Sequence, residues 1–319
     1  VSAERHSFSS YRIGPDGTPE LVGTVGASAG LGIAAPQDIV TATVQGRSYA
    51  LLAAPGSSSI AVTEVGTDGR LRVTDLVADD LYSRFERVTV LETRAVGDRV
   101  LIAAAGADDG ITLMTLLPGG RLVRLASFEA RPGIPLMNPA ALALDWAGGR
   151  IDIFAAAEGA AGLVRLRATP GVAAPILQGG PGNDRLTGDA RSDMILGGAG
   201  NDTLSGGAGD DILRDGAGSD TLSGGAGADI FVLDGDGLRD AITDFEPGVD
   251  KLDITSNTRT RVFESPADAF DQFVTALDDD MTQFIYTHES PTVIPDAYLR
   301  DVAANSSKKL TNNVDVGPE

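Results

Sequence analysis

The chain has 319 residues, of which 42% are hydrophobic, and a mean hydropathy of +0.03, as expected of a folded protein long enough for two domains. The formal net charge of -20, from 45 acidic and 25 basic residues, argues against nucleic acid and anionic membranes as partners and leaves divalent cations as counterions. There is no cysteine, so disulfides are excluded, and no apolar run of about eighteen residues predicts a membrane span.

Residues 1–170 are predicted to form an all-β domain, because short alternating strands are separated by glycine turns and helix-period patterns are scarce. A longer repeat lies over this pattern. Arg47, Arg99 and Arg150 each follow a turn residue and precede an apolar strand, at spacings of 52 and 51 residues. Four short strands in roughly fifty residues are typical of a propeller blade. We expect the three arginines to serve the turns in which they lie.

The blades do not make a complete propeller. Residues 1–30 supply the outer half of one blade, two full blades follow, and residues 139–168 supply three inner strands. Closed propellers usually have about four to eight blades. We therefore expect a partial propeller or one completed by another chain, with self-association or a protein or glycan partner at this domain. An ordinary β-sandwich with accidental spacing is the alternative.

Residues 179–232 repeat the nine-residue phrase Gly-Gly-x-Gly-x-Asp-x-(large apolar)-x six times without an insertion. The glycines permit tight turns with exposed carbonyls, and the residues after the aspartate form a very short strand with one side chain inward. A flexible Gly/Asp linker is the alternative, but a linker has no reason to keep the apolar residue in phase. The aspartates at position six are Asp184, Asp193, Asp202, Asp211, Asp220 and Asp229.

The phrase resembles the calcium-binding nonapeptide of the RTX (repeats in toxin) family, which forms a parallel β-roll. The resemblance implies that two nonapeptides make one coil and that calcium, Ca²⁺, lies between stacked turns. Copies one, three and five would line one edge, and copies two, four and six the other. Turn carbonyls and carboxylates suit this oxygen-preferring cation. The expected calcium-binding residues are the six aspartates together with Gly180, Gly182, Gly198, Gly200, Gly207, Gly209, Gly216, Gly218, Gly225 and Gly227.

Two copies depart from the phrase. Asp189 and Arg191 replace glycines in the second copy, and Asp215 replaces the first glycine of the fifth. Arg191 places a cation in a turn expected to hold one, so we expect the site between copies two and four to be weaker than the others. One apolar residue in nine cannot offset the entropy of ordering a glycine-rich chain, so we expect the roll to fold only with calcium.

Acidic residues continue beyond the repeats, and the roll with its cap is expected to span residues 176–255. Residues 240–245 and 250–254 resemble the segment that caps the roll in RTX proteins, which implies a further calcium at Asp240, Asp250 and Asp253. A solvated polar cap is the alternative.

Residues 256–319 are expected to form a separate C-terminal region. Residues 266–273 predict a short helix, followed by a strand at 284–286. In the RTX family this region carries an uncleaved type I secretion signal. The polar tail with Lys308 and Lys309 departs from the apolar ending expected of such a signal.

No catalytic motif is present in the sequence. The two histidines, His6 and His288, form no His-Glu-x-x-His pair, and no Gly-x-Ser-x-Gly elbow occurs, so we expect no enzymatic activity in these residues. The start at Val1, without a basic-then-apolar leader, suggests a processed N-terminus or a fragment.

The sequence as a whole predicts an all-β protein, with a propeller-like domain that is partial or completed in an oligomer, followed by a calcium-binding parallel β-roll. We expect it to be secreted by the type I machinery, to reside outside the cell or on its surface, and to have a structural or adhesive role. The alternative is the C-terminal part of a larger secreted hydrolase, with the roll as its export and folding module.

Overall fold

The protein divides into two compact units, Val1–Ser256 and Asn257–Glu319. The structure is a computed structural model, and the regular elements of its described residues are strands apart from one short 3-10 turn, η2, at Pro55–Ser57. Within the part of the chain that it describes, no helix has the length and apolarity needed to cross a membrane. The described residues are 7–26, 31–79, 83–158, 160, 162–169, 174–236, 238–256, 270–276, 283–290, 293–301 and 306–309.

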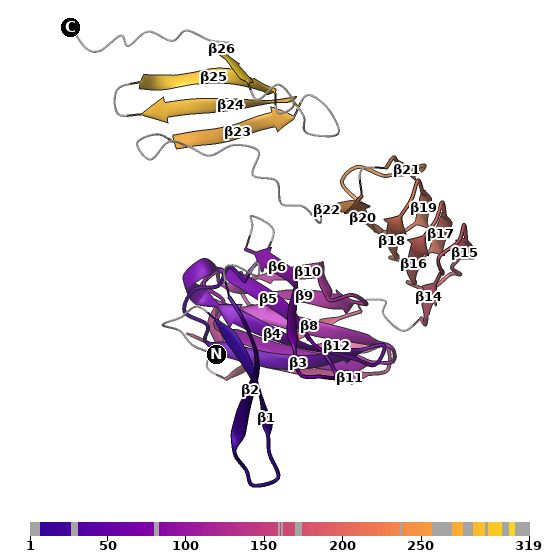
Figure 1. Cartoon of the computed structure of the whole chain (residues 1–319). Coiled ribbons are helices and arrows are strands. Elements are labelled where there is room, and N and C mark those ends of the chain that lie inside the picture. Colours follow the sequence, from indigo (N-terminus) through magenta and orange to yellow (C-terminus); the bar gives the residue numbers. More distant parts are fainter. Residues whose placement is uncertain are drawn as a thin grey trace, which may run out of the picture. The chain divides into compact units, whose positions relative to one another are not determined.

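Antiparallel meanders build the N-terminal domain (Figure 1). Two four-stranded sheets have the orders β3-β4-β5-β6 and β7-β8-β9-β10, a third has the order β11-β12-β13, and β1 pairs with β2 alone. These sheets correspond to the half blade, two full blades and three strands expected from the sequence, so the propeller-like fold class is confirmed. The strands are β1 Phe8–Ile13, β2 Pro19–Val25, β3 Asp38–Val44, β4 Arg47–Ala54, β5 Ser59–Val65, β6 Leu71–Ala78, β7 Val90–Val96, β8 Arg99–Ala105, β9 Gly110–Leu117, β10 Arg121–Glu129, β11 Met137–Ala147, β12 Arg150–Glu158 and β13 Leu163–Ala168.

Inner strands of the blades carry the core of this domain. Every residue of β8 is buried, as are the last six residues of β4. Their nearly continuous apolar sequences suit strands that are covered on both faces. One cluster joins the first two full blades through Leu51 and Ile102, and a second joins the second blade to β11–β13 through Leu101 and Ile153. Neighbouring blades therefore pack face to face.

The repeats wind into a parallel solenoid. Alternate copies enter two sheets, with the orders β14-β16-β18-β20-β22 and β15-β17-β19-β21. Leu204 lies beside Leu222, and hydrogen bonds between stacked turns join residues 18 apart, so two nonapeptides make one coil, as expected. The strands are β14 Ile176–Gln178, β15 Arg185–Thr187, β16 Met194–Ala199, β17 Thr203–Ala208, β18 Ile212–Ala217, β19 Thr221–Ala226, β20 Ile230–Gly235, β21 Ala241–Ile242 and β22 Lys251–Ser256.

The five-stranded sheet of the roll, β14-β16-β18-β20-β22, has apolar residues on both faces. Its inward residues join those of the other sheet in a core that includes Leu213 and Phe231. Its outward residues, among them Ile212 and Ile230, pack against Leu117 and Val123 of the second full blade. The expectation of a single buried apolar residue per nine is therefore wrong for copies two, four and six, because copies two and six also bury both residues that flank the inward one and copy four buries Ile212.

The second unit contains a single described sheet with the order β23-β24-β25-β26. The predicted helix is wrong for residues 270–273, which begin a strand paired with β24. Val274 and Thr275 are β-branched and favour an extended backbone there. Residues 266–269 lie outside the described residues. The predicted strand at 284–286 lies within β24, and Lys308 and Lys309 lie in β26. The strands are β23 Phe270–Ala276, β24 Gln283–Ser290, β25 Val293–Asp301 and β26 Ser306–Lys309.

Candidate metal centre

The aspartates at position six form a row along each edge of the roll. Within a row, the main-chain N–H of each aspartate donates to Oδ1 of the aspartate in the next coil. Asp184 donates to Asp202 at 2.8 Å, and Asp202 to Asp220 at 2.6 Å. On the other edge Asp193 donates to Asp211, and Asp211 to Asp229, at 2.7 and 2.9 Å. The structure thus brings all six residues together in the two rows that the repeat predicts.

The second oxygen of most of these carboxylates is buried without a hydrogen bond. This is true of Oδ2 in Asp202, Asp211, Asp220 and Asp229, whose exposed fraction is at most 2%. A buried charged group without a partner is costly, and an oxygen-preferring cation is the partner that such a carboxylate oxygen would take. The residues present therefore fit calcium.

In the first coil, by contrast, the Oδ2 atoms of the aspartates accept hydrogen bonds. Oδ2 of Asp184 accepts the main-chain N–H of Gly180 at 2.7 Å, and Oδ2 of Asp193 accepts that of Asp189 at 2.8 Å. Two of the six carboxylates therefore have Oδ2 engaged by a peptide N–H of their own copy. The unpaired oxygens lie in the coils that follow.

Burial raises the pKa of several of these carboxyls. The pKa of Asp211 rises to about 7, first because burial disfavours the charged form and then because Asp229 and Asp193 repel it. The pKa values of Asp220, Asp229 and Asp240 are also raised, again mainly by burial. A cation that enters these turns therefore competes with protons as well as with water.

The turn glycines are required because stacked coils approach too closely for a side chain. A Cβ at Gly216 would lie 2.0 Å from the main-chain oxygen of Gly198, and one at Gly200 would lie 2.6 Å from the carbonyl carbon of Gly182. Gly216 and Gly200 also have φ values of +103° and +117°, which side chains rarely tolerate. In the first coil, by contrast, Gly180 and Gly182 have no positive φ and no close neighbour. Eight of the glycines predicted to bind calcium have a positive φ: Gly198, Gly200, Gly207, Gly209, Gly216, Gly218, Gly225 and Gly227.

The departures in copy two also fall in the first coil. Neither Asp189 nor Arg191 has a positive φ. Arg191 forms an ion pair with Asp189 at 2.7 Å, both side chains being more than half exposed, and its hydrogen bonds hold the pKa of Asp189 down at about 2. The cation expected to weaken the site between copies two and four is therefore matched by an adjacent carboxylate. The weaker affinity of that site stays a prediction.

Two of the three predicted cap residues extend the rows. Asp220 donates its main-chain N–H to Oδ1 of Asp240, and Asp229 donates to Oδ1 of Asp250, both at 3.0 Å. The offsets are 20 and 21 residues instead of 18, because the cap turns are longer than a nonapeptide turn. Asp253 does not join them. It lies in β22 and forms an ion pair with Arg121 of β10.

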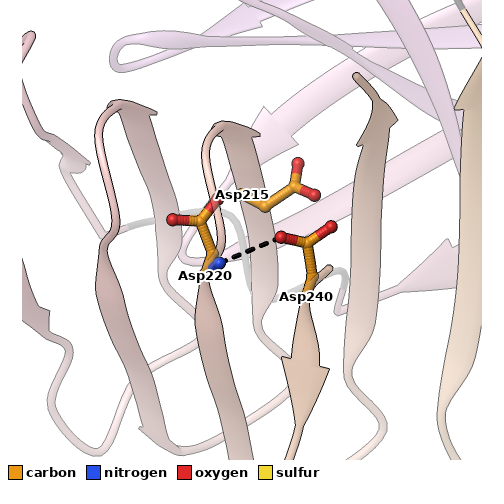
Figure 2. A group of neighbouring side chains, drawn as sticks. All are labelled: Asp215, Asp220 and Asp240. Carbon is orange, nitrogen blue, oxygen red and sulfur yellow. Dashed lines mark hydrogen bonds between the residues drawn. The ribbon is translucent and has the colours of Figure 1, made fainter. Parts of the chain in front are cut away.

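Asp215 is the residue whose role sequence reasoning missed. Instead of interrupting the turn, its side chain is fully buried and lies with Asp220 and Asp240 (Figure 2). One oxygen from each carboxylate lies within 4.8 Å of the others. Burial raises the pKa of Asp215 to about 7. The sequence did contain a signal for this role, because the residue that replaces glycine at position one of copy five is an aspartate, whose carboxylate can itself be an oxygen ligand.

Arg99 of the propeller-like domain lies beside the row that contains Asp193 and Asp211. Arg99 is 2% exposed, and its Nη2 donates to the main-chain oxygen of Ser192 at 3.2 Å. Burial lowers the pKa of Arg99 to about 10, with Asp193 and Asp211 acting in the opposite direction. The expectation that Arg99 serves its own turn is therefore wrong. Arg47, at the equivalent position one blade earlier, is exposed and forms an ion pair with Glu64.

Comparison with known proteins agrees with the repeat. A family model described as the RTX calcium-binding nonapeptide repeat (4 copies) matches residues 178–213 and 205–237. No curated protein matches the chain.

Several solved structures resemble parts of the chain. A protein from Lactobacillus plantarum is 16% identical with a TM-score of 0.33, over 50% of this chain and 47% of that one. The periplasmic gluconolactonase PpgL of Pseudomonas aeruginosa is 14% identical with a TM-score of 0.34, over 98% and 65%. The AlgE6R2 subunit of the Azotobacter vinelandii mannuronan C5-epimerase is 29% identical with a TM-score of 0.25, over 41% and 88%. The chain thus spans about half the length of the Lactobacillus protein.

Proposed function

We propose, from the premise that residues 178–237 are RTX calcium-binding nonapeptide repeats, that this is a secreted protein whose roll acquires its structure by binding extracellular calcium. One observation carries the proposal: the buried, unpaired Oδ2 atoms of Asp202, Asp211, Asp220 and Asp229. Without a cation, the stacked carboxylates repel one another across a distance at which charges in a protein interact strongly. With a cation, they become ligands.

The expected ligands are the carboxylates of the two rows and the carbonyls of the turns that bear them. Calcium supplies positive charge and takes about six to eight oxygen ligands, which closely stacked turns can offer. Extracellular calcium modules bind at about 10⁻⁴ to 10⁻³ M. A roll in this range would be loaded outside a cell and unloaded inside it. Binding energy would then also be folding energy.

A structural or adhesive role is the second part of the proposal. The hairpin β1–β2 pairs with no other described strand and exposes Tyr11, Ile13 and Leu21 by 57%, 65% and 61%. Exposed apolar side chains on an isolated hairpin suit contact with another protein or another copy of the chain. We propose no enzymatic activity for these residues.

Circular dichroism of the full chain, followed through a calcium titration from a chelated start, tests the calcium part. We expect β-structure to increase with calcium and not with equimolar magnesium, because magnesium demands a smaller octahedral shell and retains its waters. The same β-content in chelator and in saturating calcium would overturn the proposal.

Sedimentation of the calcium-loaded chain tests the adhesive part, for the case in which the partner is a second copy. Self-association is expected at rising protein concentration, and substitution of Tyr11 and Leu21 by serine should reduce it. A strictly monomeric profile would count against self-completion of the propeller.

A further inference from the structure

Asp215 occupies a position from which a side chain enters the metal-binding region of a turn. In the regular copies this position is glycine, and a Cβ there would meet the carboxylate of the same copy. The separation would be 2.1 Å between a Cβ at Gly206 and Oδ2 of Asp211, and 2.1 Å between a Cβ at Gly224 and Oδ2 of Asp229. A side chain at position one is therefore directed at the carboxylate of position six. In copy five that side chain is itself a carboxylate.

The turn that carries Asp215 lies next to an irregular one. Asp240 stacks on Asp220 with an offset of 20 residues, so the cap turn cannot follow the backbone of a nonapeptide turn. The main-chain N–H of Asp234, near the C-terminal end of β20, donates to Oδ1 of Asp215 at 2.8 Å. Asp215 thus joins the last regular turn of this edge to the strand that precedes the cap.

The three carboxyl groups lie close together, with Asp215 and Asp220 buried and Asp240 half-buried. Oδ2 of Asp215 and Oδ2 of Asp220 accept no hydrogen bond, and the two residues are 0% and 2% exposed. Other aspartates, among them Asp234 and Asp236, repel the charged forms of these carboxyls. Burying such a group is expensive unless an ion lies between the carboxylates.

We propose that Asp215, Asp220 and Asp240 form a three-carboxylate site for a hard divalent cation, and that this site binds calcium more tightly than the positions between regular coils. The proposal rests on the calcium binding proposed above and adds to it a specific first site. A regular position offers two stacked carboxylates, as between Asp202 and Asp220. A third carboxylate raises affinity, because the number of charged ligands tunes calcium binding. The replacement for glycine is then a gain of a ligand, not a defect.

The test counts calcium ions bound per full-length chain at free concentrations set by a chelator buffer, using equilibrium dialysis and metal analysis. The reference value is the lowest free calcium concentration at which the unsubstituted protein binds one calcium ion per chain. Asp215→Asn keeps the size of the side chain, and Asp215→Gly restores the glycine of the repeat. Both variants are expected to bind their first ion at least about tenfold more weakly.

A matched control is available in the same roll. Asp210 is exposed and accepts the main-chain N–H of Ala228 at 2.9 Å, in the way that Asn201 accepts that of Ser219 at 3.0 Å. Asp210→Asn therefore removes the same charge but keeps the hydrogen bond, and the first ion should bind within about twofold of the unsubstituted affinity.

The possible results separate this inference from the proposed function. If Asp215→Gly binds its first ion as tightly as the unsubstituted chain, or more tightly, Asp215 is a defect and the inference is wrong. If Asp215→Asn and Asp210→Asn weaken binding equally, general charge accounts for the effect and the inference is also wrong. If the unsubstituted chain holds no ion at millimolar calcium, the proposed function itself fails.

Discussion

Arg99 donates a hydrogen bond to the main-chain oxygen of Ser192 at 3.2 Å, which joins the first residue of β8 in the propeller-like domain to a turn of the roll. The guanidinium is buried, and Asp193 and Asp211 favour its charged form. A positive charge of the blade therefore lies beside an acidic row of the roll. The roll is supported by its neighbour as well as by its own repeats.

Arg99→Met should lower the free energy of unfolding by about 1–3 kcal/mol, because the half-buried carbonyl of Ser192 loses its donor. Arg47→Met is the control, since Arg47 holds the equivalent position in the preceding blade but is exposed, and its loss should cost at most about 0.5 kcal/mol. Urea denaturation in saturating calcium, followed by circular dichroism, measures both. Equal losses in the two variants would show that the contact with Ser192 contributes nothing.

Gly200→Ala and Gly182→Ala change the same position of the repeat in successive coils of one edge. Gly200 has a φ of +117° and a Cβ there would meet the carbonyl carbon of Gly182 at 2.6 Å, whereas a Cβ at Gly182 meets nothing within 4 Å. Strain of about 1–3 kcal/mol at Gly200 should raise the calcium concentration at half folding by about fivefold or more. Gly182→Ala should shift it by less than about twofold. The measurement is a calcium titration followed by circular dichroism, and similar shifts would refute the close stacking of coils.

Ile212→Thr places at position seven of copy four the threonine that copies three and five have there. Ile212 is buried against the second full blade, whereas Thr221, its counterpart in the other sheet, is exposed. Burying the hydroxyl should destabilise the chain by about 1–3 kcal/mol. Thr221→Ile, the reverse exchange, should change stability by less than about 0.5 kcal/mol. Urea denaturation compares them, and a harmless Ile212→Thr would mean that the apolar outer face of the roll is not needed.

Calcium removal should affect the two parts of the first unit differently. Hydrogen exchange read by mass spectrometry should show loss of amide protection across residues 176–254 in chelator, since the stacked carboxylates then lack a counterion. Strands β4 and β8 should keep their protection, because their cores are apolar and hold no comparable acidic row. Uniform loss across both parts would instead indicate one cooperative unit that includes the blades.

The period of nine was sufficient to predict the solenoid, because its stabilising contacts join residues at one constant offset. The pairing of Asp202 with Asp220 follows directly from that offset. The role of Asp215 does not, since it depends on a cap turn with an offset of 20 residues that no repeat describes. The role of Arg99 depends on a neighbouring domain, and the spacing of 52 residues between Arg47 and Arg99 gives no hint that the two differ.

The apolar outer face of the roll could have been predicted. Position seven holds Met194, Ile212 and Ile230 in the even copies but Thr203 and Thr221 in two of the odd ones, an alternation that is visible in the sequence. The strand at Phe270–Ala276 was harder to predict, because a short apolar pattern fits a helix or a strand until its pairing is known.

The hydrogen bonds along the two aspartate rows have a direction in the chain. Each donating N–H depends on a carboxylate that comes 18 residues later, and the last ones depend on Asp240 and Asp250. A chain that emerges from the ribosome N-terminus first therefore carries incomplete coils until its downstream neighbours have been made. Each coil can be completed only after the next one has been made, so the rows close coil by coil in the order of synthesis, and the last regular coil stays incomplete until Asp240 and Asp250 are in place.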